Sequence, residues 1–314
     1  QDLTPTISRD LKPDSKYIVL SDCHRGSGMG GDEFAHNSLI YKCALTYYLK
    51  EGFTYIELGD AEELWENEDF EQIYITHTSV YDLLRRFHDP DSEKTRYLKV
   101  WGNHDEIWQD NTAPLAGLFP GLCVYEAVRL VAPNPGEGSK DGKTILLLHG
   151  HQADPSCSGF GARISKFLIR RIWSGLQRVG IGDPTRAAEN HGRCDKIDET
   201  LANWAKGRLG NEPLNLTNTI IAGHTHRPVY ENLSLTERRC LESGIGTPGV
   251  CRKEAPNTVY YNTGSCVHPR CITGIEITTS RPHFSLVKWG YTAVGEGADP
   301  PYTLSITRTV LEPH

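Results

Sequence analysis

The sequence predicts an α/β fold built on a largely parallel sheet. Three apolar, strand-like runs lie within residues 17–20, 53–60 and 96–105, and each leads into a polar turn. Residues 34–51 and 69–88 separate these runs and have the length and mixed polarity of helices. Strand–helix–strand units of this spacing are typical of parallel sheets, in which ligands gather at the carboxyl ends of the strands.

The second half of the chain is expected to add further strands. Residues 143–151 and 218–226 repeat the pattern, and each of these apolar runs ends in histidines. Residues 259–265, 271–279 and 283–290 also have strand composition and are expected to be antiparallel. One sheet would then bring all five polar strand ends to the same edge.

A helical cap is expected over the strand ends, formed by residues 152–215. Between Phe160 and Arg178, apolar residues recur at three- and four-residue steps, with five basic residues and no acidic one. A second helix is expected over residues 194–207. The basic stretch is open to three interpretations: packing on the domain, a groove for the anionic or acyl part of a substrate, or a peripheral membrane or dimer contact.

Length and composition narrow the function classes. We expect one domain over residues 1–314, with C-terminal strands over 258–314. The net charge of −7 argues against nucleic-acid binding. No apolar stretch approaches the roughly 18 residues that a membrane span needs, and no signal peptide is recognised at the amino terminus. The nine scattered cysteines form no CxxC pair, so we expect reduced thiols in a cytoplasmic protein.

Seven polar residues at the strand ends are candidate metal ligands: Asp22, His24, Asp60, Asn103, His149, His224 and His226. Each is weak evidence alone, because an Asp-x-His or a turn histidine is usually structural. Together they offer carboxylates, imidazoles and one amide oxygen, which suit Mn²⁺, Fe or Zn²⁺ better than a structural thiolate site. Seven ligands are too many for one tetrahedral ion and fit two ions that share a bridging carboxylate.

These residues fall in five ordered motifs: "DCH" (22–24), "GD" (59–60), "GNHD" (102–105), "HGH" (149–151) and "GHTH" (223–226). The set resembles the signature of the calcineurin-like metallophosphoesterases, D-x-H, G-D, G-N-H-D/E, H and G-H-x-H. The resemblance spans roughly residues 16–265. It implies a four-layer αββα sandwich with a helical cap insertion and a two-metal site at the sheet edge.

The resemblance also implies a role for each residue. One metal would be held by Asp22, His24, Asp60 and His226. The other would be held by Asp60, Asn103, His149 and His224, so that Asp60 bridges the two ions. His104 would be the non-ligand histidine beside the substrate oxygens, and Asp105 would orient it. The ions, Mn²⁺ with Fe or Zn²⁺ as alternatives, would supply hydroxide that hydrolyses a phosphomonoester, phosphodiester or pyrophosphate bond.

Elementary chemistry supports such a site. Two ions about 3.5–4 Å apart lower the pKa of a bridging water and neutralise phosphate oxygens. His104 could stabilise the transition state or protonate the leaving group. A carboxylate behind that histidine would fix its tautomer.

Within this family, the stretch "IELGDAEELWE" (56–66) is most similar to the UDP-2,3-diacylglucosamine pyrophosphohydrolases, which have a related second motif and a helical insertion. The chain departs from them at Arg25, where they carry an apolar residue, and at His151, where they carry aspartate. We expect Arg25 and His151 to contact the substrate phosphate or to support the ligands. Glu63 and Trp65 are expected to pack against the site or orient it. The resemblance therefore implies a small phosphorylated substrate that is linked to a nucleotide or a lipid.

Two alternatives stay open. A protein phosphatase is disfavoured, because that branch resembles G-D-x-x-D-R-G at the second motif and "GDAEELW" has no arginine there. A non-catalytic metal-binding scaffold on the same fold is also disfavoured. Such scaffolds usually lose ligands, whereas this chain retains all seven together with His104.

Overall fold

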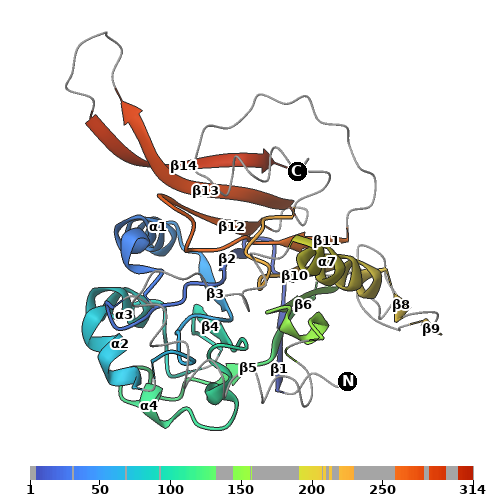
Figure 1. The fold of residues 1–314 in the computed structure, drawn as a ribbon, viewed down its shortest axis with the longest axis horizontal. Coiled ribbons are helices and arrows are strands. Elements are labelled where there is room, and N and C mark those ends of the chain that lie inside the picture. The colour runs from blue at the N-terminus through green and yellow to red at the C-terminus, as the bar shows by residue number, and fades with distance from the viewer. Residues whose placement is uncertain are drawn as a thin grey trace.

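The computed structural model describes residues 5–29, 32–67, 69–91, 93–131, 144–155, 157, 191–206, 208–209, 212–213, 219–229, 259–278, 283–294 and 303–313. These residues form a mixed α/β structure with two mixed β-sheets and few helices (Figure 1). The α/β class predicted from the sequence is therefore confirmed. Within the described residues, no helix has both the length and the apolar character to cross a membrane.

The first sheet has seven strands, which are in spatial order β14 (Thr303–Pro313), β13 (His283–Val294), β12 (Cys271–Thr278), β2 (Lys16–Leu20), β3 (Thr54–Leu58), β4 (Tyr97–Val100) and β5 (Val124–Tyr125). Strands β2 to β5 run parallel to one another. Strands β12, β13 and β14 are antiparallel to their neighbours. The segments that follow β2, β3 and β4 therefore leave the sheet at the same edge.

The second sheet has five strands, which are in order β1 (Thr6–Asp10), β6 (Ala127–Val131), β7 (Thr144–Leu148), β10 (Thr219–Ala222) and β11 (Tyr260–Asn262). Only β6 and β7 pair antiparallel in it. The prediction that one sheet carries all five motifs is wrong, because β7 and β10 belong to this second sheet. The antiparallel direction predicted for β11 is also wrong, since β11 pairs parallel with β10.

The described helices are α1 (Ser38–Lys50), α2 (Phe70–Thr76), α3 (Thr78–Arg85), α4 (Ala113–Ala116) and α7 (His191–Ala205), with 3₁₀ turns at Ala35–Asn37, Glu106–Gln109 and His151–Ala153. The single helix expected over residues 69–88 is divided at His77 into α2 and α3. A two-stranded ribbon joins β8 (Arg208–Leu209) to β9 (Glu212–Pro213). Helices α1, α2 and α3 lie on one side of the molecule and α7 on the other (Figure 1).

Strand β2 explains why the apolar runs are continuous and do not alternate with polar residues. Ile18 and Leu20 belong to a core that includes residues of α1 and α3. Tyr17 and Val19 point the other way, into a core shared by the two sheets. Because both faces of the strand are covered, every residue of the run must be apolar.

A third core lies between the second sheet and α7. Ile197 and Leu201 of the helix pack there with Leu146 and Ile220 of the sheet. Helix α7 corresponds to the helix expected over residues 194–207. Residues 158–190, which include the basic amphipathic stretch of the predicted cap, lie outside the described residues.

Candidate metal centre

The ends of five strands from both sheets bring the candidate ligands together. Two groups of ligand atoms form there, and the atoms of each group lie within 4.8 Å of one another: Asp22, His24 and His226 form the first, and Asp60, His149 and His224 form the second. We call them the first and the second ligand group. The division agrees with the one that the family resemblance implies for the five ligands other than Asp60 and Asn103: Asp60 is grouped with the second set only, and Asn103 with neither.

Asp60 lies between the two ligand groups. Its Oδ2 atom is 3.1 Å from His149 Nε2 in the second group and 3.7 Å from His24 Nε2 in the first. Its Oδ1 atom accepts a hydrogen bond of 2.8 Å from the His104 backbone N–H. Burial raises the pKa of Asp60, but the charges of His149 and His104 outweigh it and hold the pKa well below its usual value. A buried, ionised carboxylate at this position is suited to bridge two cations.

Three buried atoms of candidate ligands form no hydrogen bond of regular geometry among the described residues: Asp22 Oδ1, Asn103 Oδ1 and His149 Nε2. Two of them lie close to another candidate ligand, because Asp22 Oδ1 is 3.2 Å from His226 Nε2 and His149 Nε2 is 3.1 Å from Asp60 Oδ2. Buried polar atoms are normally paired, and leaving one unpaired costs about 1–3 kcal/mol. All three belong to predicted ligands, and they comprise a carboxylate, an amide and an imidazole. The residues therefore fit two divalent metal ions, one beside Asp22 and the other beside Asn103 and His149.

Two ligand histidines are held by acceptors on the side away from the other ligands. His24 Nδ1 lies 2.7 Å from Glu63 Oε2, and His149 Nδ1 lies 2.9 Å from the Leu58 carbonyl oxygen. Because these oxygens can only accept, each Nδ1 carries a proton, and in the neutral ring that a metal ion requires, each Nε2 would keep a lone pair. His24 Nε2 is then 3.2 Å from His226 Nε2. Metal-binding histidines are usually oriented by such a second contact.

Five candidate ligands have left-handed backbone conformations, with φ angles of 52° at Asp22, 47° at His24, 50° at Asp60, 67° at His224 and 55° at His226. Among the described non-glycine residues, only Arg270 shares a positive φ. Each such residue is strained by about 1–3 kcal/mol, and such strain clusters at functional sites. The strain therefore falls on the residues whose side chains converge.

Two motif glycines are required by the ligands beside them. A Cβ atom at Gly102 would collide with the Asp60 carboxylate. A Cβ at Gly223 would collide with Ser21 and lie 2.5 Å from Asp22 Oδ2. The glycines of "GNHD" and "GHTH" therefore leave room for ligands supplied by other motifs.

His104 lies beside the ligand groups and is partly open to solvent, with 18% of its side chain exposed. Its Nδ1 is 2.9 Å from Glu63 Oε1, and its ring stacks on Trp65 with centroids 4.0 Å apart. Burial would lower the pKa of His104, but the carboxylates of Glu63 and Asp60 outweigh burial and raise the pKa to about 10. Bound cations would lower this pKa. Nε2 is the nitrogen left for a substrate.

Glu63 orients the site, as one reading of the sequence expected. Its Oε2 atom lies 2.7 Å from His24 Nδ1 and 2.8 Å from His104 Nδ1, and its Oε1 atom lies 2.9 Å from His104 Nδ1. Burial would raise the pKa of Glu63, but the charges and hydrogen bonds of the two histidines lower it to about 2. The carboxylate is therefore ionised at neutral pH and can accept from both rings.

Replacing Glu63 with glutamine is expected to lower turnover roughly 10–100-fold, the usual effect of a residue behind a ligand. Glutamine keeps the size of the side chain but removes its negative charge and replaces one acceptor oxygen with an NH₂ donor, so the contacts with His24 Nδ1 and His104 Nδ1 are weakened. Initial rates and metal content would measure the effect. Glu71→Gln, on the exposed surface of α2, is the matched control, and equal rates for both variants would contradict the orienting role.

The carboxylate of Asp105 contacts backbone N–H groups, and the role predicted for it in orienting His104 stays a prediction. Its Oδ1 accepts from the Gly102 backbone N–H at 2.6 Å, and its Oδ2 accepts from the Ala61 N–H at 2.9 Å. Both oxygens thus tie the loop after β3 to the loop after β4. Asp105 is fully buried under these loops, whereas His104 faces the ligands.

The substrate contact predicted for Arg25 is not supported. Its guanidinium is fully buried and forms ion pairs with Glu57 at 2.8 Å and Glu62 at 2.6 Å. Lys99 pairs with the same two carboxylates at 2.8 and 2.9 Å. We call these four residues the buried charge network. Arg25 fills it because two carboxylates need two cations in an interior without water.

Replacing Arg25 is expected to destabilise the folded protein. Arg25→Met leaves two buried carboxylates with one cation, which should lower the free energy of unfolding by about 3–5 kcal/mol. Chemical denaturation would measure it. Arg9→Met is the control, because the Arg9–Glu93 pair is 3.4 Å long with an 82% exposed glutamate, and such pairs contribute little. Unchanged stability of Arg25→Met would contradict the role of the network.

His151 lies beside the second ligand group. Its ring centroid is 5.4 Å from that of His149 and 5.0 Å from that of Trp101. The side chain is largely buried. The substrate contact predicted for His151 stays a prediction.

The sequence missed one carboxylate in contact with a ligand. Asp154 Oδ2 lies 2.9 Å from His224 Nε2, and Asp154 is buried. It lies 70 positions from His224 in the sequence. No local spacing links two residues so far apart, so only the fold reveals the contact.

A scan against protein-family models and a search of curated proteins found no match to this chain. The functional assignment therefore depends on the motifs and on the geometry of the ligand groups.

Proposed function

We propose that the protein is a dinuclear metal-dependent phosphoesterase of the calcineurin-like type. The observation that carries the proposal is the position of Asp60 between two ligand groups, within 3.1 Å of His149 and 3.7 Å of His24. The buried Asn103 Oδ1 atom supports it, because this atom forms no hydrogen bond among the described residues and a metal ion would satisfy it. The three successive cores support a four-layer αββα sandwich as the finer fold.

Different residues of the chain would have different roles in such a reaction. Two bound divalent ions would lower the pKa of a water and neutralise the oxygens of a phosphoester. His104, held at Nδ1 by Glu63, presents Nε2 to the substrate and, in its protonated form, can donate a proton to the leaving oxygen. Trp65 fixes the plane of the His104 ring by stacking on it.

The donor set favours Mn²⁺, with Fe or Zn²⁺ as alternatives, because it combines imidazoles with carboxylate and amide oxygens and uses no thiolate. The substrate class is a small phosphomonoester, phosphodiester or pyrophosphate, nucleotide- or lipid-linked. The second motif supports a relationship to the UDP-2,3-diacylglucosamine pyrophosphohydrolases, because both Glu63 and Trp65 contact His104.

The test combines metal analysis with turnover. The purified chain, loaded with Mn²⁺, is expected to hold two ions and to hydrolyse bis-p-nitrophenyl phosphate, p-nitrophenyl phosphate or a diphosphate ester. Two bound ions without turnover of any phosphoester would favour a non-catalytic scaffold. Turnover restricted to phosphoproteins would favour a protein phosphatase. Absence of metal binding would overturn the proposal.

A further inference from the structure

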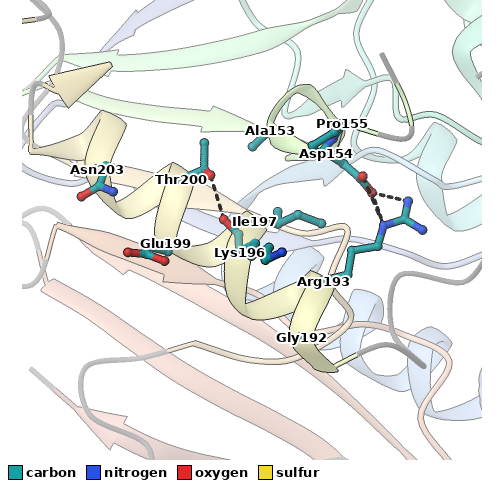
Figure 2. A pocket seen from close by; sticks show the side chains of 10 residues that line it. All are labelled: Ala153, Asp154, Pro155, Gly192, Arg193, Lys196, Ile197, Glu199, Thr200 and Asn203. Atoms are coloured by element: carbon teal, nitrogen blue, oxygen red, sulfur yellow. Dashed lines mark hydrogen bonds and ion pairs between the residues drawn. The ribbon is translucent and has the colours of Figure 1, made fainter. Parts of the chain in front are cut away.

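A chain of polar contacts leads from helix α7 to the second ligand group. Arg193 of α7 donates to Asp154 through Nη2 at 2.5 Å and through Nε at 3.1 Å. Asp154 in turn contacts His224 Nε2 at 2.9 Å. Figure 2 shows the Arg193 side chain reaching from the helix to the Asp154 carboxylate. The helix is thus connected to a candidate ligand through a single carboxylate.

This arrangement fixes the tautomer of His224. A carboxylate that already accepts from a guanidinium can only accept again, so His224 Nε2 carries the proton. Nδ1 then keeps the lone pair and is the nitrogen available to an ion shared with Asp60 and His149. Carboxylate–histidine–metal arrangements of this kind orient the ring and strengthen the ligand.

Helix α7 also contacts the residues that follow His224 in the sequence. Thr225 donates to Asp198 at 3.4 Å, and Arg227 pairs with Asp195 at 2.8 Å. Helix α7 therefore contacts Thr225 and Arg227 directly and His224 through Asp154, and residues 224–227 supply His224 to the second ligand group and His226 to the first. Only the contact through Asp154 reaches a ligand side chain.

We propose that Asp154 and Arg193 are positioning residues for the second ligand group, and that α7 sets the metal affinity of that group through them. The inference rests on the proposed two-metal function. Neither residue needs to touch substrate, because Arg193 acts on Asp154 and Asp154 acts on His224. The first ligand group has its own orienting carboxylate, Glu63, so it should not depend on this contact.

Lys196 offers a matched control. It lies one turn further along α7 and lines the same pocket of about 690 Å³ as Arg193 and Asp154 (Figure 2). Among the described residues, its side chain forms no ion pair with Asp154. Arg193→Ala and Lys196→Ala therefore remove a cation from the same helix and pocket, and only the first removes the contact to Asp154.

The experiment is a titration with Co²⁺, followed by visible absorption of the bound ion. The wild-type chain is expected to bind two ions. Arg193→Ala and Asp154→Asn should weaken one of them roughly 10–100-fold and leave the other unchanged. Lys196→Ala should match the wild type. Added guanidinium should restore the affinity of Arg193→Ala, which a general loss of structure would not allow.

The possible results of the Co²⁺ titration distinguish a failure of this inference from a failure of the proposed function. Two ions bound with wild-type affinity in Arg193→Ala and Asp154→Asn would overturn the inference and leave the proposed function intact. Equal weakening of both ions without rescue would also overturn it, in favour of a general structural role. A wild-type chain that binds no Co²⁺ would overturn both.

Discussion

Asparagine in place of Asp60 is expected to abolish two-metal binding and turnover together. The substitution keeps an Oδ1 acceptor for the His104 backbone N–H, so the loop can keep its shape. It removes the charge that lies between His149 and His24. Turnover should fall by more than the roughly 10–100-fold typical of a residue behind a ligand. Metal analysis and initial rates with Mn²⁺ would measure both effects.

The control for Asp60→Asn is Asp82→Asn, which makes the same change at a side chain that is 58% exposed on α3. It should leave metal content and rate unchanged. Two tightly bound ions in Asp60→Asn would show that no carboxylate bridge is needed. The assignment of the two ligand groups to one dinuclear centre would then be wrong.

The positions of the candidate ligands were predictable because a strand that is buried on both faces must be apolar, and its end can be recognised in the sequence. Runs such as residues 17–20 are covered on both faces, so they are wholly apolar, and the first polar residue after them marks the strand end. Carboxyl ends of parallel strands share an edge, which brings Asp22, Asp60 and Asn103 together. The seven ligand residues could be named from this pattern and the family resemblance.

The assignment of strands to sheets was not predictable from the same pattern. A strand buried on both faces has the same composition in either sheet, so nothing local separates β7 and β10 from β2, β3 and β4. The two sheets share one core, and Val19 and Ile221 belong to it from opposite sides. Partition into two sheets depends on pairing between distant segments, which the alternation of side chains does not encode.

The direction in which each side chain points was also not predictable from the sequence. Glu62 and Glu63 are neighbours, but Glu62 joins the buried charge network and Glu63 contacts the histidines. His104 and Asp105 are also neighbours, but His104 contacts Glu63 and Asp105 contacts backbone N–H groups of the loops. The sequence motifs locate these residues near the site, but the buried contacts of Glu62 with Arg25 and Lys99 determine that Glu63 is the carboxylate that faces the ligands.

Alanine in place of His104 is expected to leave metal binding intact and to lower turnover about 10²–10⁴-fold, the usual contribution of a general acid or base. The contact from residue 104 to Asp60, the proposed bridging ligand, is made by the backbone N–H, which alanine retains. Only the imidazole is lost, together with its contacts to Glu63 and Trp65. Metal content and initial rates, compared with those of Asp60→Asn, would distinguish a catalytic residue from a ligand.

The leaving group decides what His104 does. If the imidazole donates a proton, alkyl phosphoesters should lose more rate in His104→Ala than p-nitrophenyl esters, because p-nitrophenolate leaves without protonation. If it stabilises charge on the phosphoryl oxygens, both classes should lose rate equally. His36→Ala, at an exposed histidine before α1, should behave as the wild type. Full activity of His104→Ala on every leaving group would contradict both roles, because the ring beside the ligands would then contribute neither a proton nor a charge.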